Sequence, residues 1–418
     1  MHNRPIHIRC DDSVVRILPD QKIDHDNQIN HYPIRRSRGY APTPIWIPWR
    51  TIPILGCGAE LKNTFCLAKD QYAFMSHHIG DLENYETYRS YEQAIEHYEK
   101  LFRVNPEILV HDLHPDYLST RYALERAENQ DLLICAAQHH HAHIASCMAD
   151  RLVQDNMPVI GIAFDGTGYG EDGAIWGGEF LVSSYTTFER YAHLKYVRLP
   201  GGDKAIREPW RIALSWLHEC SLEWSDELPP VRWIHEHGIP EDVFRKQIDL
   251  SIQCPDTSSM GRLFDAIASL VGLRNCVNYE AQGAIELEAV VNPITNDYYH
   301  FSIENSPTGP RIIDPAPIIH GVITDLRQHI PVGDISAKFH NSIMYMVLEI
   351  SRLIRSDFGI TTVALSGGVW QNMTLLQKTI QCLQKNQFHV LWHHQVPTND
   401  GGISLGQAAI AIHRMSRT

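Results

Sequence analysis

The segment 131–149 places four histidines at the start of a predicted helix, directly after a predicted strand. Residues 131–137 (Asp-Leu-Leu-Ile-Cys-Ala-Ala) form a short apolar run that is typical of a buried strand. Residues 138–149 (Gln-His-His-His-Ala-His-Ile-Ala-Ser-Cys-Met-Ala) then predict a helix. This order favours an α/β protein that carries its chemistry at the carboxyl edge of a sheet.

His139 and His143 are the histidines best placed to bind one metal ion. They are four positions apart, so on a helix their rings project from one face. Two histidines do not hold a metal well alone, and we expect a carboxylate to complete the site. Asp400 is the expected third ligand, because it lies in a glycine loop before the last predicted helix. The ligand types allow iron, zinc or manganese; the alternative interpretation is a helix N-terminus with incidental histidines.

The bulk composition argues against several classes of protein. At 418 residues the chain is long enough for about two or three domains. A formal net charge of −13 argues against a general nucleic-acid surface. No apolar run approaches the ~20 residues of a membrane span, and the N-terminus lacks a signal-peptide core. Nine cysteines without a Cys-x-x-Cys pair are typical of free thiols. We therefore expect a cytoplasmic protein with no nucleic-acid or membrane partner.

Residues 1–45 contain too few predicted strands to bury a core alone. We expect them to pair with a missing domain or to pack on the rest of the chain. Arg35, Arg36 and Arg38 suit anion binding, because arginine offers a planar fork of donors; a solvated basic turn is the alternative. Residues 42–53 are proline-rich and predict a linker, which we place at residues 46–53.

The main body opens with a predicted hairpin over residues 54–68, whose tip carries Gly58, Lys62 and Asn63. Such a tip can approach phosphates, with Lys62 as a point charge, although Gly-x-Gly hairpins are common. Strands and helices alternate after it, which predicts a mostly parallel sheet.

Residues 159–170 combine an apolar strand, an aspartate and alternating glycines. The strand ends in Asp165, which is placed to hold a cation or to polarise a nucleophile. Glycine lets backbone N–H groups approach an anion closely, whereas the simpler interpretation is a tight β-turn. The candidate phosphate-binding residues here are Asp165, Gly166, Thr167, Gly168 and Gly170.

Two further segments suit anionic or nucleotide ligands. Lys204, Arg207 and Arg211 form a local basic cluster in an acidic protein. An apolar strand at 361–365 leads into Ser-Gly-Gly and a helix, so that a ligand can lie against the backbone at the helix N-terminus. The candidate nucleotide-binding residues here are Ser366, Gly367, Gly368, Val369 and Asn372. Asp265, on a predicted helix, is either catalytic or part of a solvated face.

Six motifs in this order along the chain resemble the HypF carbamoyltransferase family of hydrogenase maturation. They are Gln138-His-His-His-Ala-His143, Asp165-Gly-Thr-Gly-Tyr-Gly170, Trp176-Gly-Gly-Glu179, Arg207-Glu-Pro-Trp-Arg211, Ser366-Gly-Gly-Val-Trp-Gln-Asn372 and Asn399-Asp-Gly-Gly-Ile-Ser-Leu-Gly406. The resemblance implies that residues 54–418 form that family's TsaD-like domain. The implied fold is α/β and two-lobed, as in actin, heat-shock chaperone ATPases and sugar kinases, with nucleotide and metal in the cleft. Residues 1–45, with Asn3-Arg-Pro-Ile and the arginine loop, resemble the tail of a YrdC-like domain.

The resemblance implies transfer of a carbamoyl group from carbamoyl-adenylate to the C-terminal cysteine of HypE, the precursor of the cyanide ligands of [NiFe]-hydrogenase. The family's acylphosphatase-like domain, zinc fingers and most of its YrdC-like domain have no counterpart in this sequence. We therefore expect a fragment, a split gene product or a reduced homologue that keeps only the last step.

The resemblance also implies roles for the candidate residues. His139, His143 and Asp400 would hold a metal, with iron implied by related domains and magnesium as a further option with the nucleotide. Lys62 and residues 165–170 would hold phosphate, and residues 366–372 would line the nucleoside. His139, His143, Lys62 and Asp165 are the expected catalytic residues, with Asp165 alternatively activating the thiol.

Two other functions fit the sequence less well. One is O-carbamoylation of a small hydroxylated acceptor, as in antibiotic or nodulation-factor pathways, which share this pair of domains. The other is a non-catalytic nucleotide-binding subunit. A sugar kinase is disfavoured, because the paired histidines would have no role.

Overall fold

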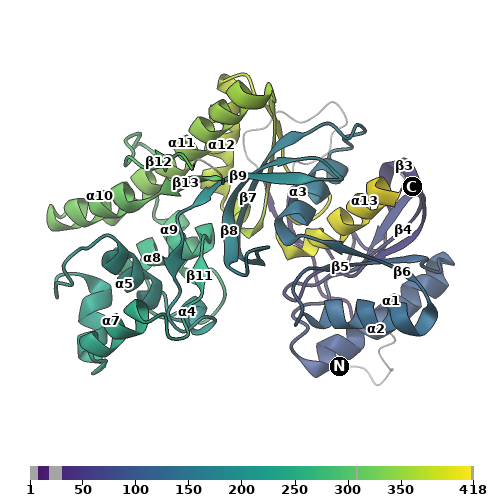
Figure 1. Ribbon diagram of the computed structural model, residues 1–418, viewed down its shortest axis with the longest axis horizontal. Helices are drawn as coiled ribbons and strands as arrows, with labels where there is room; N and C mark the ends of the chain where they lie inside the picture. Colours follow the sequence, from purple (N-terminus) through teal and green to yellow (C-terminus); the bar gives the residue numbers. More distant parts are fainter. Residues whose placement is uncertain (1–7, 18–30, 307–308, 416–418) are drawn as a thin grey trace.

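Two mixed β-sheets, each flanked by helices, divide the chain into two lobes (Figure 1). The computed structural model describes residues 8–17, 31–306 and 309–415. None of the helices in these described ranges combines the length and the hydropathy that crossing a membrane requires. The architecture confirms the predicted two-lobed α/β fold.

Lobe I is built on a four-stranded sheet in the order β4-β3-β5-β6. Its strands are β3 (Ile45–Gly56), β4 (Cys66–Met75), β5 (Ile108–Asp112) and β6 (Leu133–Ala137). β3 and β4 form an antiparallel hairpin, whereas β5 and β6 run parallel to β3. Helices α1 and α2 cover one face through a core that includes Leu55, Leu67 and Leu109. These helices are α1 (Tyr85–Phe102) and α2 (Leu118–Gln130).

Lobe II is built on a larger sheet with the main path β12-β13-β9-β8-β7-β14-β15. Its strands are β7 (Val159–Tyr169), β8 (Ile175–Ser183), β9 (Phe188–Leu194), β12 (Ser302–Glu304), β13 (Arg311–Asp314), β14 (Thr362–Ser366) and β15 (His389–Leu391), with short β10 (Val197–Arg198) and β11 (Asp256–Thr257) beside β8. β7, β8 and β9 form an antiparallel meander, while β14 runs parallel to both β7 and β15. The mostly parallel sheet predicted from the alternation of strands and helices in the first part of the chain is found in β3, β5 and β6 of lobe I, whereas hairpins join successive strands at the centre of lobe II.

The remaining helices of lobe II form its principal core with β7 and β14. They are α4 (Lys204–Arg207), α5 (Trp210–Glu219), α6 (Pro229–Glu236), α7 (Glu241–Asp249), α8 (Met260–Leu270), α9 (Gln282–Ala289), α10 (Ala316–Arg327), α11 (Val332–Phe358) and α12 (Met373–Lys385). The short 3-10 turns η1 (Gly368–Gln371) and η2 (Asp400–Gly402) precede α12 and the last helix.

Helices α3 (His139–Asp150) and α13 (Ile403–Met415) lie between the two sheets (Figure 1). Every residue of α3 is buried, because the helix contacts β7 and β14 on one side and α13 and lobe I on the other. A Cβ atom at Gly406 would lie 1.8 Å from the carbonyl oxygen of Ala142. Only glycine permits this approach, and the packing sets the first turn of α3 beside the loop that precedes α13.

The N-terminal segment packs on the rest of the chain, as one of the two alternatives predicted. β1 (Val14–Ile17) and β2 (His31–Arg35) form an antiparallel ribbon. Tyr32 is buried and its hydroxyl donates to the carbonyl oxygen of Trp370 in lobe II. Its likeness to the tail of a YrdC-like domain stays a prediction, and the motif at residues 3–6 lies outside the described residues.

The predicted linker at residues 46–53 is instead part of β3. Ile45 and Ile47 are buried, and Ile45 and Trp46 pair with Ala73 and Tyr72 of β4. Register shifts interrupt this pairing around Thr51, so the prolines occupy an irregular part of the strand. Proline is compatible with such positions, because a bulge leaves ladder hydrogen bonds unmade.

Candidate metal centre and active site

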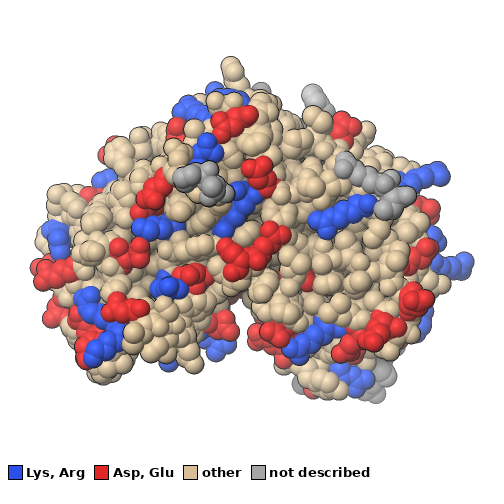
Figure 2. Space-filling model, in the orientation of Figure 1, with Lys and Arg blue, Asp and Glu red and all other residues tan. Residues whose placement is uncertain are grey.

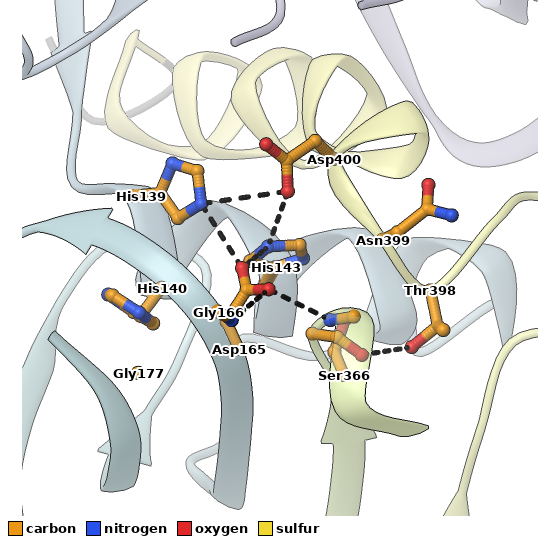
Figure 3. A network of polar contacts seen from close by, with 12 residues as sticks. His139, His140, His143, Asp165, Gly166, Gly177, Ser366, Thr398, Asn399 and Asp400 are labelled. Atoms are coloured by element: carbon orange, nitrogen blue, oxygen red, sulfur yellow. Dashed lines mark hydrogen bonds and ion pairs between the residues drawn. The ribbon is translucent and has the colours of Figure 1, made fainter. Parts of the chain in front are cut away.

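Two histidines and two aspartates converge where the lobes meet (Figure 3). One donor atom from each of His139, His143, Asp165 and Asp400 lies within 4.8 Å of the other three. Asp165 Oδ2 is 3.0 Å from His143 Nε2 and 3.4 Å from His139 Nε2. Asp400 Oδ1 is 3.6 Å and 3.9 Å from the same nitrogens. The structure thus brings the three predicted metal ligands together and adds Asp165 to them.

Local structure explains why the two histidines face the cluster. The side chain of Gln138 caps α3 by accepting the N–H of His141, so the helix begins at His139. His139 and His143 then stand one turn apart. A Cβ atom at Gly168 would lie 2.4 Å from the ring of His140, so glycine lets β7 pass over these rings. The role of Gly168 here is close packing on histidine.

The two aspartates lie at irregular backbone: Asp165 sits at a bulge within β7, which continues past its predicted end to Tyr169, and Asp400 begins the 3-10 turn η2. The pairing of β7 with β8 is interrupted just after Phe164, and the bulge turns Asp165 toward α3. Asp165 Oδ1 accepts the N–H groups of Gly166 at 2.8 Å and Gly368 at 3.2 Å. The loop that carries Asp400 is fixed by hydrogen bonds from residues 64 and 146 to its backbone, and from Asn399 to the carbonyl oxygen of residue 34.

Asp112 orients His139 by contacting Nδ1, the ring nitrogen that does not face the cluster. His139 Nδ1 lies 2.8 Å from Asp112 Oδ2, and both side chains are fully buried. An ionised carboxylate can only accept, so Nδ1 carries the hydrogen and Nε2 is left free to bind a metal. Among the described residues, His139 Nε2 makes no hydrogen bond of good geometry, and Asp165 Oδ2 lies 3.4 Å from it. Asp112 was missed as a site residue, although it ends β5 beside the strand that leads into α3, and the ends of adjacent parallel strands share one edge.

The charges of the cluster compensate one another. Burial opposes protonation of His139, but the Asp112 and Asp165 carboxylates outweigh it and raise the pKa of His139 well above its ordinary value. Burial likewise opposes ionisation of Asp165, yet the adjacent imidazoles of His139 and His143 hold its pKa well below the ordinary value. An ionised Asp165 is a weak base, which favours a ligand role over activation of a thiol.

These donors fit a divalent transition metal. Two imidazole nitrogens and two carboxylate oxygens suit iron, manganese or zinc, and an isolated buried imidazole nitrogen such as His139 Nε2 is the expected mark of such a site. The alternative of incidental histidines does not explain why two carboxylates meet them, one from β7 and one from η2.

A cleft of about 1190 Å³ opens between the lobes, lined by Thr167 and Gly168 just after the Asp165 turn. Its charged lining residues are Glu60, Asp81, Glu83, Asp116, Asp203, Lys204, Arg207 and Glu280. Six of these eight side chains are acidic, so positive charge is confined to Lys204 and Arg207 in a lining that is acidic overall. The space-filling view shows a notch between the lobes and interspersed acidic and basic side chains (Figure 2).

Lys62 reaches across the cleft. Its backbone has φ 47° and its N–H donates to Asp81, while its ammonium pairs with Glu280 of lobe II. The carboxylates of Glu280, Asp400 and Asp165 raise the pKa of Lys62 against the opposing effect of burial. Lys62 is therefore a cation near the metal cluster, as its predicted phosphate role requires, but it is held by Glu280.

Gly58 and Asn63 serve the fold of the β3–β4 loop. The N–H of Gly58 donates to Gln407 Oε1 at 2.7 Å, and its φ of 78° suits glycine. Asn63 is fully buried, and its amide nitrogen donates to the carbonyl oxygens of Cys57 and Ala59. The side chain of Asn63 is thus directed into its own loop and away from the cleft, contrary to its predicted role.

The Ser-Gly-Gly segment lies against β7. Gly367 has φ 104°, and a Cβ atom there would lie 2.2 Å from the carbonyl oxygen of Phe164. Gly368 donates to Asp165, whereas Val369 packs against the core of lobe II. The nucleotide-binding role of this segment stays a prediction.

The polar side chains that flank this segment have internal partners. Ser366 Oγ lies 2.8 Å from His393 Nε2. Asn372 caps α12 by accepting the N–H of Leu375, and its amide nitrogen lies 2.8 Å from His340 Nε2. Neither side chain leaves its polar atoms free for a nucleoside without rearrangement.

The N-terminal arginines are engaged within the chain. Arg35 and Arg38 pair with the aspartates at 11 and 12. Arg36 is buried, and its guanidinium donates to the carbonyl oxygens of residues 40, 43 and 75. Arg36 therefore ties the segment to lobe I and is not available as an anion site.

Two other candidates have packing roles. Arg211 pairs with Glu208 and lies over the ring of Trp210, 4.5 Å from its centroid. A Cβ atom at Gly170 would lie 2.2 Å from Nε1 of Trp176, so Gly170 makes room for that ring.

The fold and the site define a class of protein. It has two α/β lobes, two helices between their sheets and polar ligands at the junction of the lobes, which is the architecture of a Kae1-like domain. Family models narrow the class: the HypF Kae1-like domain matches residues 50–150, and the second subdomain of the carbamoyltransferase Kae1-like domain matches residues 161–407. The chain belongs to the HypF carbamoyltransferase family.

Known HypF proteins are similar to this chain in sequence and structure over almost its whole length. Carbamoyltransferase HypF of Synechocystis sp. is 40% identical over 99% of this chain and 53% of that protein. A HypF homolog of Cupriavidus necator is 33% identical over 87% of this chain and 92% of that protein. Full-length HypF, solved in a phosphate- and nucleotide-bound form, has a TM-score of 0.89 and 43% identity over 99% of this chain and 62% of that one. The chain thus spans about half the length of the first of these relatives.

Proposed function

We propose that this chain transfers a carbamoyl group from carbamoyl-adenylate to the C-terminal cysteine thiol of HypE. The observation that carries the proposal is the buried cluster of His139, His143, Asp165 and Asp400 beside a cleft between the lobes. Membership of a family of carbamoyltransferases and likeness to a nucleotide-bound HypF support the same reaction.

The reaction exchanges one acyl bond for another. The sulfur attacks the carbamoyl carbon, a C–S bond forms, and the bond from that carbon to the phosphate oxygen breaks. AMP leaves with the bonding electron pair, and the thiol proton is lost to solvent. A divalent metal, with iron as our expectation, supplies Lewis-acid polarisation of the carbonyl and phosphate oxygens when bound at the cluster.

The residues of the chain bind and orient in this scheme. His139, His143, Asp165 and Asp400 hold the metal, with Asp112 fixing the ring of His139. Lys62 and the cations of lobe II, Lys204 and Arg207, attract the phosphate into the cleft.

A transfer assay tests the proposal. The purified chain is mixed with carbamoyl-adenylate and HypE, and the mass of HypE is read for a carbamoyl addition on its last cysteine. We expect modification by the wild-type chain and none by the His139→Ala/His143→Ala variant, which should lose bound metal and keep its fold. His235→Ala, which removes an exposed histidine of α6, is the matched control.

If a full-length HypF control is active in parallel and this chain transfers no carbamoyl group, the proposal that this chain carbamoylates HypE is refuted. Transfer to a small hydroxylated acceptor in its place would favour the O-carbamoyltransferase alternative. Unchanged metal content in the double-histidine variant would refute the assignment of the metal centre.

A further inference from the structure

Arg262 is a buried cation whose donors are only partly used. It lies in the first turn of α8, and only 4% of its surface is exposed. Its Nη2 pairs with Asp265 Oδ2 at 3.0 Å, whereas Nε and Nη1 have no hydrogen-bond partner in the part of the chain that the structure describes. A buried charged group with unpaired donors is costly, so a side chain kept in this state indicates that another group completes it.

The guanidinium lies beside the loop that supplies Asp165 to the metal cluster. Ser259 Oγ caps α8 and contacts the carbonyl oxygens of Asp165 and Gly166 at 3.0 Å and 2.7 Å, which ties the helix N-terminus to this loop. Arg262 Nη2 is 3.7 Å from the position of a Cβ atom on Gly166, and no other heavy atom lies within 4 Å of that position. The guanidinium therefore lies next to the segment that carries Asp165, a residue of the metal cluster.

The partner of these donors must carry acceptor oxygens. A guanidinium only donates, and its planar fork matches phosphate or carboxylate oxygens. The N-terminus of α8 adds partial positive charge at the same place. Asp265 holds one corner of the guanidinium, so the cation is positioned before a ligand arrives. Burial raises the pKa of Asp265 to about 6, which Arg262 opposes, so the pair carries little excess negative charge to repel an anion.

We infer that Arg262 binds the phosphate of the nucleotide and distinguishes a nucleoside monophosphate from the bare nucleoside. The inference rests on the nucleotide site of the proposed function and adds to it a specific phosphate ligand. Arg262 was not among the predicted anion-binding residues, because the sequence places it on an ordinary amphipathic helix.

Calorimetric titration with AMP and with adenosine tests the inference without any transfer step. The wild-type chain is expected to bind AMP more tightly than adenosine. Arg262→Gln should weaken AMP binding by about 10- to 100-fold, the usual effect of a charged hydrogen bond, and leave adenosine binding unchanged. Arg262→Lys should keep part of the preference, because the charge remains while the fork is lost.

Arg274→Gln is the matched control, since it removes an exposed guanidinium of the same lobe that pairs with Glu286 at the surface. An AMP preference that survives in folded Arg262→Gln would overturn the inference. Should both Arg262 variants fail to fold, a crystal structure of the wild-type chain with AMP decides. A phosphate in contact with Arg262 supports the inference, and a phosphate elsewhere, with water on Nε and Nη1, overturns it. Loss of carbamoyl transfer with intact AMP discrimination would count against the proposed function alone.

Discussion

At the scale of single residues, the orientation of the metal ligand His139 is set by a hydrogen bond to a residue outside the cluster. Asp112 accepts from Nδ1 of His139 and thereby selects the tautomer whose Nε2 faces the cluster. The carboxylate also accepts the N–H of His114 at 3.0 Å, which holds it in place. The ring of His139 therefore needs no rearrangement before it binds a metal.

Asp112→Asn is expected to weaken metal binding by about 10- to 100-fold while the metal still binds. An amide can donate as well as accept, so it no longer enforces one tautomer of His139. Competition with a chromogenic chelator measures the affinity, and Asp116→Asn, an exposed change in the following loop, is the control. Equal affinities for the two variants would show that Asp112 does not position the ligand.

Metal affinity should fall as the pH falls. In the metal-free chain, neighbouring carboxylates raise the pKa of His139 and of His143 in spite of their burial. A metal binds neutral imidazole, so a raised pKa extends competition by protons to higher pH than for free histidine. For each proton that the metal displaces, the metal affinity should fall about tenfold for each unit by which the pH is lowered. Titration of Mn²⁺ at several pH values measures the slope, and a flat profile would contradict this charge assignment.

At the scale of elements, glycines at contacts between α3 and its neighbours set the site. Gly406 permits the close approach of α13 to α3, and Gly168 permits β7 to cover the histidine rings. Asp400 immediately precedes α13, whereas His139 and His143 lie on α3. The spacing of these two helices therefore determines the separation of the ligands.

Gly406→Val should lower the melting temperature and weaken metal binding together. Its Cβ would lie 1.8 Å from a backbone oxygen, which cannot move without shifting α3. Overpacking of this kind typically costs about 1–3 kcal/mol. Gly309→Ala is the control, since its nearest neighbour is the flexible hydroxyl of Ser306 at 3.2 Å. A destabilised variant with unchanged metal affinity would separate helix packing from ligand geometry.

Sequence patterns predicted the elements better than the contacts. Helical spacing identified His139 and His143, and a glycine loop before the last helix identified Asp400; all three lie in one cluster. Asn63 and Arg36 were predicted to bind ligands from residue type alone. Their donors are instead taken by backbone carbonyls of nearby loops, and a sequence does not show which carbonyls will need a partner. The prolines of 46–53 suggested a linker because an irregular strand shares that composition.

At the scale of the whole molecule, the site belongs to neither lobe alone. Asp165 comes from the sheet of lobe II, the histidines from a helix between the sheets, and Lys62 from the hairpin of lobe I (Figures 1 and 3). The ion pair of Lys62 with Glu280 is a direct polar link between the two sides of the cleft. A phosphate that uses Lys62 must therefore compete with Glu280.

Glu280→Gln should strengthen the binding of AMP by a few fold. The pair is partly exposed, with 29% of the Lys62 side chain and 49% of the Glu280 side chain accessible. Such a pair contributes about 0–1 kcal/mol, so its removal should raise the affinity for AMP by up to about fivefold. Lys62→Met should have the opposite effect, because it removes the cation itself. Glu286→Gln, also in the acidic segment around α9 but paired outside the cleft with Arg274, is the control. If AMP binds equally to all four chains, Lys62 does not contact phosphate, and the link between the lobes is purely structural. If only Lys62→Met binds AMP more weakly, Lys62 contacts the phosphate without leaving Glu280. The ion pair across the cleft then persists when the nucleotide is bound.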